Sequence, residues 1–148
     1  MPGPNLKTRA LTHLARREHS RLELEKKLAP HARGFEELAQ LLDDLEQCGA
    51  LSSARMVEHV IHVRKSRFGS QRIVHELREK GIPENLIAAQ LPNIKEAEQL
   101  NAYEVWRKKF GAVPANAQEL GRQMRFMRSR GFASETISRV LRRAEGEE

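Results

Sequence analysis

The most constraining feature of this chain of 148 residues is a short pattern that occurs twice. A basic residue, a glycine and an apolar residue lead into an apolar helix, first as KGIPENLIAAQL at 80–91 and again as RGFASETISRVL at 130–141. The two copies lie about fifty positions apart, a spacing typical of small helical units that stack and bury one another's apolar faces. The sequence therefore predicts a protein built from repeats.

Helix start and stop signals predict three helices in the first unit, over about 5–18, 20–30 and 35–48. Ser20 and Glu23 have the spacing of a capping box, which begins a helix by pairing two side chains with two backbone N–H groups. Pro30 is expected to end that helix, and Gly49 is a typical left-handed stop after the third helix. The first unit is therefore predicted to span residues 1–50.

The second unit, over 51–92, repeats this order of helices. We expect helices over about 53–68, 70–80 and 83–91, the second capped by Ser70 and the third opened by Pro83. The residues expected to end them are, in order, Gly69, Gly81 and Pro92.

The third unit, over 93–148, is predicted to contain helices over about 96–110, 116–130 and 134–144. Asn116 with Glu119 forms a second candidate capping box, and Ser134 is expected to cap the last helix. The predicted fold class is thus all-α, with three tandem three-helix repeats of the helix-turn-helix kind in an elongated, curved arrangement.

Composition supports this fold class and excludes several kinds of protein. Charged residues make up 31% of the chain and aromatic residues only 5%, and strand-like alternation is nearly absent. No apolar run approaches the roughly 20 residues that span a bilayer, and the N-terminus lacks the pattern of a signal peptide. With one cysteine, Cys48, no internal disulfide can form, so we expect a monomeric cytoplasmic protein that does not associate with a membrane.

Positive charge is concentrated in the third unit, although the whole chain carries a net charge of only +6. Residues 1–51 contain eight basic and eight acidic side chains, whereas residues 107–143 contain ten basic and two acidic ones. Arginine favours planar anions, either phosphates or clustered carboxylates on a protein, and the sequence does not separate these targets. The ten candidates for binding an acidic partner or DNA are Arg107, Lys108, Lys109, Arg122, Arg125, Arg128, Arg130, Arg139, Arg142 and Arg143.

Signals for catalysis and for metal binding are weak. His59 and His62 share a helix face, but two ligands do not make a structural zinc site, and Cys48 has no positioned base beside it in the sequence. No glycine-rich nucleotide-binding motif is present. We therefore expect no enzyme activity, no metal and no cofactor.

Three aromatic residues, Tyr103, Trp106 and Phe110, recur at helical spacing in the third unit. Such residues could stack on nucleic-acid bases, but the spacing is that of a helix stripe facing a core. We interpret them as core residues.

Five segments, taken in order, resemble the RecX family of bacterial regulatory proteins. They are LARREHSRLELEKKL, LLDDLEQCGALSSARMVEHVIHVR, GSQRIVHELREKGI, VWRKKFG and QMRFMRSRGF, and the resemblance spans roughly residues 6–143. The chain departs from the family pattern at Ser53, where the family usually has Asp, and at Met56, where it usually has Phe. Ser53 can still cap a helix and Met56 can still fill a core position.

The resemblance implies tandem three-helix repeats and a role in DNA repair, homologous recombination and the SOS response. Family members bind the RecA recombinase filament on DNA, lie along its groove and mostly inhibit its ATPase, strand-exchange and co-protease activities. Inhibition or stimulation by this member, and direct contact with single- or double-stranded DNA, are left open by the sequence. The alternatives are a helix-turn-helix DNA-binding protein, with Thr136, Arg139 and Arg143 reading a major groove, and a scaffold for another acidic protein.

Overall fold

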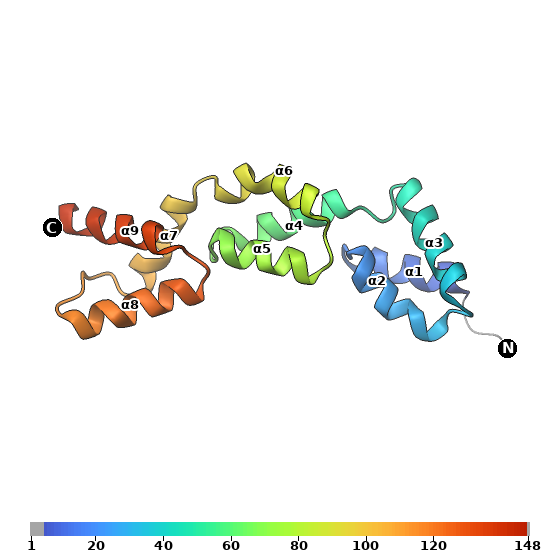
Figure 1. The fold of residues 1–148 in the computed structure, drawn as a ribbon, viewed down its shortest axis with the longest axis horizontal. Coiled ribbons are helices and arrows are strands. Elements are labelled where there is room, and N and C mark those ends of the chain that lie inside the picture. The colour runs from blue at the N-terminus through green and yellow to red at the C-terminus, as the bar shows by residue number, and fades with distance from the viewer. Residues whose placement is uncertain (1–4, 148) are drawn as a thin grey trace. The chain divides into compact units, whose positions relative to one another are not determined.

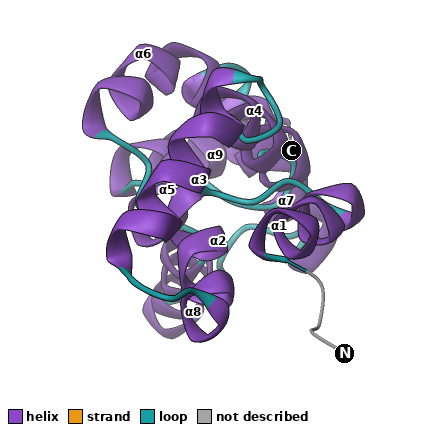
Figure 2. Ribbon diagram, turned by 90° about the vertical axis from the view of Figure 1, so that its right-hand side faces the viewer, coloured by secondary structure: helices purple, strands orange, loops and turns teal. Residues whose placement is uncertain are grey.

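The structure is a computed structural model that describes residues 5–147. Over this range the chain forms nine α-helices and one short 3-10 helix, and Figures 1 and 2 show helices joined by loops without a strand. The predicted all-α class is confirmed. The described residues form two compact units, one from 5–59 with 77–87 and the other from 60–76 with 88–147. The division into repeats at 1–50, 51–92 and 93–148 stays a prediction.

The N-terminal compact unit begins with three α-helices and the 3-10 helix. They are α1 (Leu6–Arg16), α2 (Arg21–Leu28), η1 (Ala29–His31) and α3 (Phe35–Gln47). Leucines from all three α-helices form its core, among them Leu24, Leu28 and Leu42. The first helix ends at Arg16, two residues before the predicted end. The second ends at Leu28, and Pro30 lies in the short 3-10 helix η1 that follows it.

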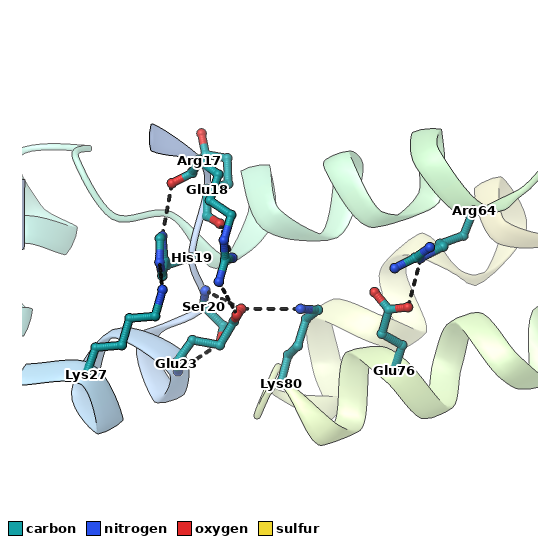
Figure 3. A network of polar contacts seen from close by, with 9 residues as sticks. All are labelled: Arg17, Glu18, His19, Ser20, Glu23, Lys27, Arg64, Glu76 and Lys80. Carbon is teal, nitrogen blue, oxygen red and sulfur yellow. Dashed lines mark hydrogen bonds and ion pairs between the residues drawn. The ribbon is translucent and has the colours of Figure 1, made fainter. Parts of the chain in front are cut away.

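The predicted capping box at the start of α2 is confirmed. The Ser20 hydroxyl accepts from the N–H of Glu23, and the Glu23 carboxylate accepts from the N–H of Ser20, each at 3.1 Å. Lys80 and Arg17 also contact this carboxylate (Figure 3). Burial raises the pKa of Glu23, but the Ser20 N–H and the two cations lower it by more, so the net shift is downward.

Three helices contribute to both compact units: α4 (Ser53–Arg64), α5 (Ser70–Glu79) and α6 (Glu84–Lys95). The prediction that the first of these continues to residue 68 was wrong. The helix ends at Arg64, whose carbonyl accepts from the N–H groups of both Arg67 and Phe68 in the turn that follows. In the same region, Arg64 pairs with Glu76 of α5 at 3.0 Å (Figure 3).

The prediction that Pro92 ends its helix was also wrong. The proline lies inside α6, which continues to Lys95, while Pro83 precedes the helix and accepts its first backbone bonds. A proline cannot donate to the carbonyl four residues earlier, and here both Pro92 and Ala88 are exposed, so water can satisfy that carbonyl. Ile94, only 2% exposed, anchors the final turn.

The remaining helices are α7 (Glu98–Lys109), α8 (Ala117–Ser129) and α9 (Ser134–Glu147). Asn116 caps α8 by accepting from the N–H of Glu119, but the Glu119 carboxylate accepts from the N–H of Ala115, so the second half of the predicted capping box is displaced by one residue. Ser134 is the first residue of α9, and its hydroxyl accepts from the guanidinium of Arg128.

The core of the C-terminal compact unit is centred on Trp106. Tyr103 and Phe110 pack against the same cluster, which confirms that the aromatic stripe belongs to the core. The indole N–H of Trp106 donates to the side chain of Gln123 at 2.7 Å, and the Gln123 amide in turn donates to the carbonyl of Ala112 at 3.0 Å. Gln123 is 3% exposed, so this pair satisfies polar groups that have no access to water.

The repeated basic-glycine turns have corresponding contacts in the two compact units. In the C-terminal unit, Gly131 packs against Arg72 near the start of α5, and in the N-terminal unit Gly81 packs against Leu22 near the start of α2. Gly131 stands about fifty positions after Gly81, and Arg72 stands about fifty positions after Leu22. Both glycines have the left-handed conformation predicted for them, with φ of 88° and 76°. The repeated turn therefore joins the end of one helix to the beginning of another in both places.

Candidate interaction surface

The ten basic candidates lie on three elements of the C-terminal compact unit. Arg107, Lys108 and Lys109 form the last turn of α7, and Arg130 is the C-terminal cap of α8. Apart from Arg130, which is half-buried, all of them are exposed. The remaining six are divided between α8, with Arg122, Arg125 and Arg128, and α9, with Arg139, Arg142 and Arg143.

Two of these cations form ion pairs with neighbours on their own surface. Arg107 pairs with Glu104 at 2.9 Å, and this hydrogen bond lowers the pKa of the Glu104 carboxyl. Arg139 pairs with Glu135 at 2.7 Å, one helical turn away. Exposed pairs of this kind contribute about 0–1 kcal/mol to stability, but they reduce the charge available to a partner.

The helix-turn-helix alternative depends on side chains that the structure shows to be engaged. Besides the pairing of Arg139, the guanidinium of Arg143 lies 3.7 Å from the centre of the Tyr103 ring, and Thr136 is half-buried. Reading bases in a major groove needs free side chains on the second helix of the motif. The geometry of α9 therefore gives this alternative little support.

Other candidates meet around a shallow cavity of about 340 Å³ in the C-terminal compact unit. Lys108 and Lys109 of α7 and Arg130 line it, together with Arg67 from the turn between α4 and α5. Val105 and Phe126 contribute apolar surface. The one carboxylate at the cavity belongs to Glu104, which Arg107 already neutralises, so the cavity carries a clear excess of positive charge.

Cations and aromatic rings alternate beside this cavity in a basic-aromatic cluster, by which we mean Phe68, Arg72, Lys109, Phe126 and Arg130. The Arg72 guanidinium lies 4.2 Å from the centre of the Phe68 ring, and that of Arg130 lies 5.3 Å from the same centre. On the other side, Arg130 and Lys109 each lie 5.1 Å from the centre of the Phe126 ring. A cation above a ring is attracted to its electron-rich face, which holds it in place without neutralising its charge.

The junction between α5 and α8 positions this cluster. The N–H of Gln71 donates to the carbonyl of Gly131, and the guanidinium of Arg72 donates to the carbonyl of Ser129 at 3.0 Å. The N–H and the hydroxyl of Ser70 both donate to the carboxylate of Glu98 in α7, so this serine does not cap its own helix as predicted. These bonds bring the turn containing Phe68 close to Arg130.

The arginines of α8 have different surroundings. Arg122 lies 5.6 Å from the centre of the Phe110 ring, and Arg128 donates to the Ser134 hydroxyl at 2.9 Å. Within residues 5–147, Arg125 makes no ion pair. All three are exposed, so this part of the surface is rich in basic side chains.

Sequence reasoning missed the contribution of the second repeat. Arg67, Phe68 and Arg72 stand in the run KSRFGSQR, where basic residues alternate with an aromatic one, a pattern typical of nucleic-acid-binding surfaces. Its helix stop and start signals alone predict only the end of one helix and the cap of the next. Its basic side chains could have been added to the candidates on the signal of that alternation.

Sites of other kinds have little geometric support. His59, His62 and Cys48 are all exposed, and the Cys48 thiol donates to the carbonyl of Leu45. Residues 5–147 do not bring three His, Cys, Asp or Glu side chains together as a metal site would require. In the same range, every helix is too short or too polar to cross a bilayer.

Comparison with known proteins identifies two parts of the chain. Residues 54–91 match the family description of the second three-helix domain of RecX, and residues 96–141 match that of the third three-helix domain. These descriptions agree with the predicted three-helix repeats.

Whole-chain comparison gives the same family. The chain is 49% identical over 146 residues to the regulatory protein RecX of Leptothrix cholodnii, covering 99% of this chain and 93% of that protein. It is 41% identical over 141 residues to the regulatory protein RecX of Ralstonia nicotianae, covering 95% of this chain and 89% of that one.

Solved structures agree on the fold. A crystal structure of regulatory protein RecX matches with a TM-score of 0.80 at 18% identity, over 91% of this chain and 70% of that one. That of RecX from Lactobacillus salivarius matches with a TM-score of 0.77 at 15% identity, over 95% and 94% of the two chains. From the matched domains and the near-full-length relatives we conclude that this chain belongs to the RecX family of regulatory proteins.

Proposed function

We propose that this chain regulates the RecA recombinase by binding the RecA–DNA filament, and that it inhibits ATP hydrolysis, strand exchange and co-protease activity. The observation that carries the proposal is the excess of unneutralised cations around the cavity at Lys108 and Arg130. A filament of protein on DNA presents the two anionic targets that such cations bind well, phosphates and clustered carboxylates.

Repeats offer a physical route to inhibition. Several small units can each contact a different subunit of a filament, and modest contacts multiply because the first one raises the effective concentration of the next. A molecule that bridges neighbouring subunits restricts the movements that accompany ATP turnover. In this proposal the protein acts in the cytoplasm as a binding partner, without catalysis or a cofactor of its own.

The direct test is the rate of ATP hydrolysis by RecA on single-stranded DNA with increasing amounts of this protein. Inhibition at amounts well below one molecule per RecA subunit is expected if each molecule acts on several subunits. Acceleration would keep the regulatory role but reverse its sign. An unchanged rate, together with no binding to the filament, would remove the proposal and leave a DNA-binding role to be tested on duplex DNA without RecA.

A further inference from the structure

The cavity between α7, α8 and the turn before α5 combines two kinds of surface in one place. Arg67, Lys108 and Arg130 provide positive charge, and Val105 and Phe126 provide apolar contact. Within the described part of the chain, none of these three cations makes an ion pair. A solvated basic surface needs no apolar floor, so the combination points to a ligand that is anionic and carries an apolar ring.

We propose that this cavity binds single-stranded DNA directly, with one unstacked base against Phe126 and Val105 and the flanking phosphates on Arg67, Lys108 and Arg130. Proteins that hold single strands without sequence preference use this pairing of aromatic stacking with a basic groove. The cavity of about 340 Å³ is near the lower limit for small-ligand sites, which suits one base and excludes a duplex. In a duplex the bases are stacked inside and only the phosphates would reach this surface.

The held position of Arg130 strengthens the assignment. Its guanidinium lies between two rings, 5.3 Å from the centre of Phe68 and 5.1 Å from that of Phe126, so its orientation is restricted before any ligand arrives. A planar guanidinium whose faces contact rings still has N–H groups along its edge, and those can bind a phosphate through two hydrogen bonds. An acidic protein segment would use the cations but would make no use of the apolar wall that Val105 and Phe126 give the cavity.

This inference rests on the proposed function, because the RecA–DNA filament is where the cavity would meet single-stranded DNA. Its test contains no RecA, so the two can fail separately. Binding of labelled oligothymidine, of an abasic strand of equal length and of a duplex is measured by fluorescence anisotropy over a range of salt concentrations. The wild-type protein is expected to prefer oligothymidine to the abasic strand by about fivefold or more.

Two variants separate charge from stacking. The cavity pair, Arg67→Gln with Lys108→Gln, should bind oligothymidine more weakly and reduce the slope of log affinity against log salt by about 1.4, two phosphate contacts' worth. The control pair, Lys7→Gln with Arg33→Gln, removes the same charge from exposed positions in the N-terminal compact unit and should leave the slope nearly unchanged. Phe126→Leu keeps an apolar side chain and should abolish the preference for bases over abasic sites.

Three outcomes would overturn the inference. Equal binding of oligothymidine and the abasic strand would show that no base enters the cavity. Equal slope changes for the cavity and control pairs would show that the charge acts only through the net field. DNA binding unchanged in the cavity pair, together with loss of RecA inhibition, would assign the cavity to an acidic protein surface. Melting temperatures of all variants are measured first, so that a folding defect is not taken for a binding defect.

Discussion

The backbone N–H of Gly69 donates a 2.7 Å hydrogen bond to the carbonyl of Arg130. This bond joins the start of α5 to the end of α8, and it requires these two segments of the backbone to approach closely. A Cβ atom at Gly69 would lie 2.4 Å from the carbonyl oxygen of Gly131, so only glycine fits there. The contact shows how closely the turn at Gly131 approaches the beginning of α5.

Replacing Gly131 by alanine should destabilise the protein more than replacing Gly49 by alanine. Both glycines have positive φ, 88° and 81°, where an L-residue costs roughly 1–2 kcal/mol. At Gly131 the new Cβ would also lie 2.4 Å from the Cβ of Arg72, whereas Gly49 has nothing within 4 Å. Unfolding by denaturant measures both changes, and equal losses would show that the junction adapts to a side chain at Gly131.

At the corresponding position of the N-terminal compact unit, Gly81→Val should also lower the stability, by about 1–2 kcal/mol or more. The backbone has a φ of 76°, and a Cβ there would lie 3.0 Å from the Cβ of Leu22. The melting temperature reports the loss, and an unchanged value would contradict the proposed equivalence of the two turns.

The stability should fall as the pH drops below about 6.5, in part because of His19. This side chain is 1% exposed, its Nδ1 lies 3.0 Å from the carbonyl of Arg17, and its Nε2 lies 2.9 Å from the Nζ of Lys27 (Figure 3). These partners fit a neutral ring that donates from Nδ1 and accepts at Nε2. Burial lowers the pKa of His19, and the charges of Arg17 and Lys27 lower it further, against the raising effects of the Arg17 carbonyl and Glu23.

The direction of this pH dependence follows from the number of protons that the folded and unfolded states bind. Between the lowered pKa of the folded state and the ordinary value of about 6.5, the unfolded chain holds more protons at this ring than the folded one, so stability is present above 6.5 and is lost as the pH falls. Melting temperatures between about pH 7.5 and 5.5 should therefore decline, and less steeply in His19→Gln. Part of the decline in melting temperature should remain in His19→Gln, because burial also lowers the pKa of His13. An equally steep decline in His19→Gln would contradict the assignment, and His59→Gln at an exposed position is the control.

Removing the hydrogen-bond acceptor of Trp106 should lower the free energy of unfolding. Gln123→Leu leaves the indole N–H buried without an acceptor, which costs roughly 1–3 kcal/mol. Trp106 is the only tryptophan in the chain and is absent from one of the backgrounds below, so unfolding is followed by circular dichroism in every variant. The double variant with Trp106→Phe removes both polar partners, so the Gln123→Leu change should cost less in that background. Equal costs in the two backgrounds would show that the hydrogen bond contributes nothing.

Reversing the charge of Arg122, Arg125 and Arg128 to Glu should weaken inhibition of RecA. All three are exposed, and none makes an ion pair within residues 5–147, so the change removes attraction without breaking a salt bridge. The matched control reverses Lys7, Arg16 and Arg33, which are equally exposed but lie in the N-terminal compact unit. Full inhibition by the α8 variant, measured by ATP hydrolysis, would mean that these arginines are only solvated surface.

Local signals in the sequence were sufficient for much of the fold. The capping box at Ser20 and the left-handed glycines were predicted correctly because each depends on the conformation of a few neighbouring residues. Pro92 shows where such signals fail. Whether a proline ends a helix depends on the burial of the next turn and on solvent access to the orphaned carbonyl, and neither is written in the local sequence.

The candidate surface was predictable only in part. Charge density along the sequence pointed to α7 and α8, and Lys108 and Arg130 line one cavity in the structure. It could not show that Arg139 would pair with Glu135 and become partly neutralised, nor that Phe68 would lie beside Arg130. The second contact depends on the junction between α5 and α8, which joins segments more than fifty residues apart and becomes visible only in three dimensions.

The bonds at Gly69 and Gln71 join main-chain atoms on both sides, and this determines which mutations the junction can tolerate. Every residue except proline supplies the same N–H and C=O groups, so the side chains around these bonds can be exchanged without altering them. The positions that cannot vary are those where an added Cβ has no space. Loop length matters in the same way: an insertion should not be accepted between Arg67 and Gln71, where one extra residue would displace the donors from their acceptors.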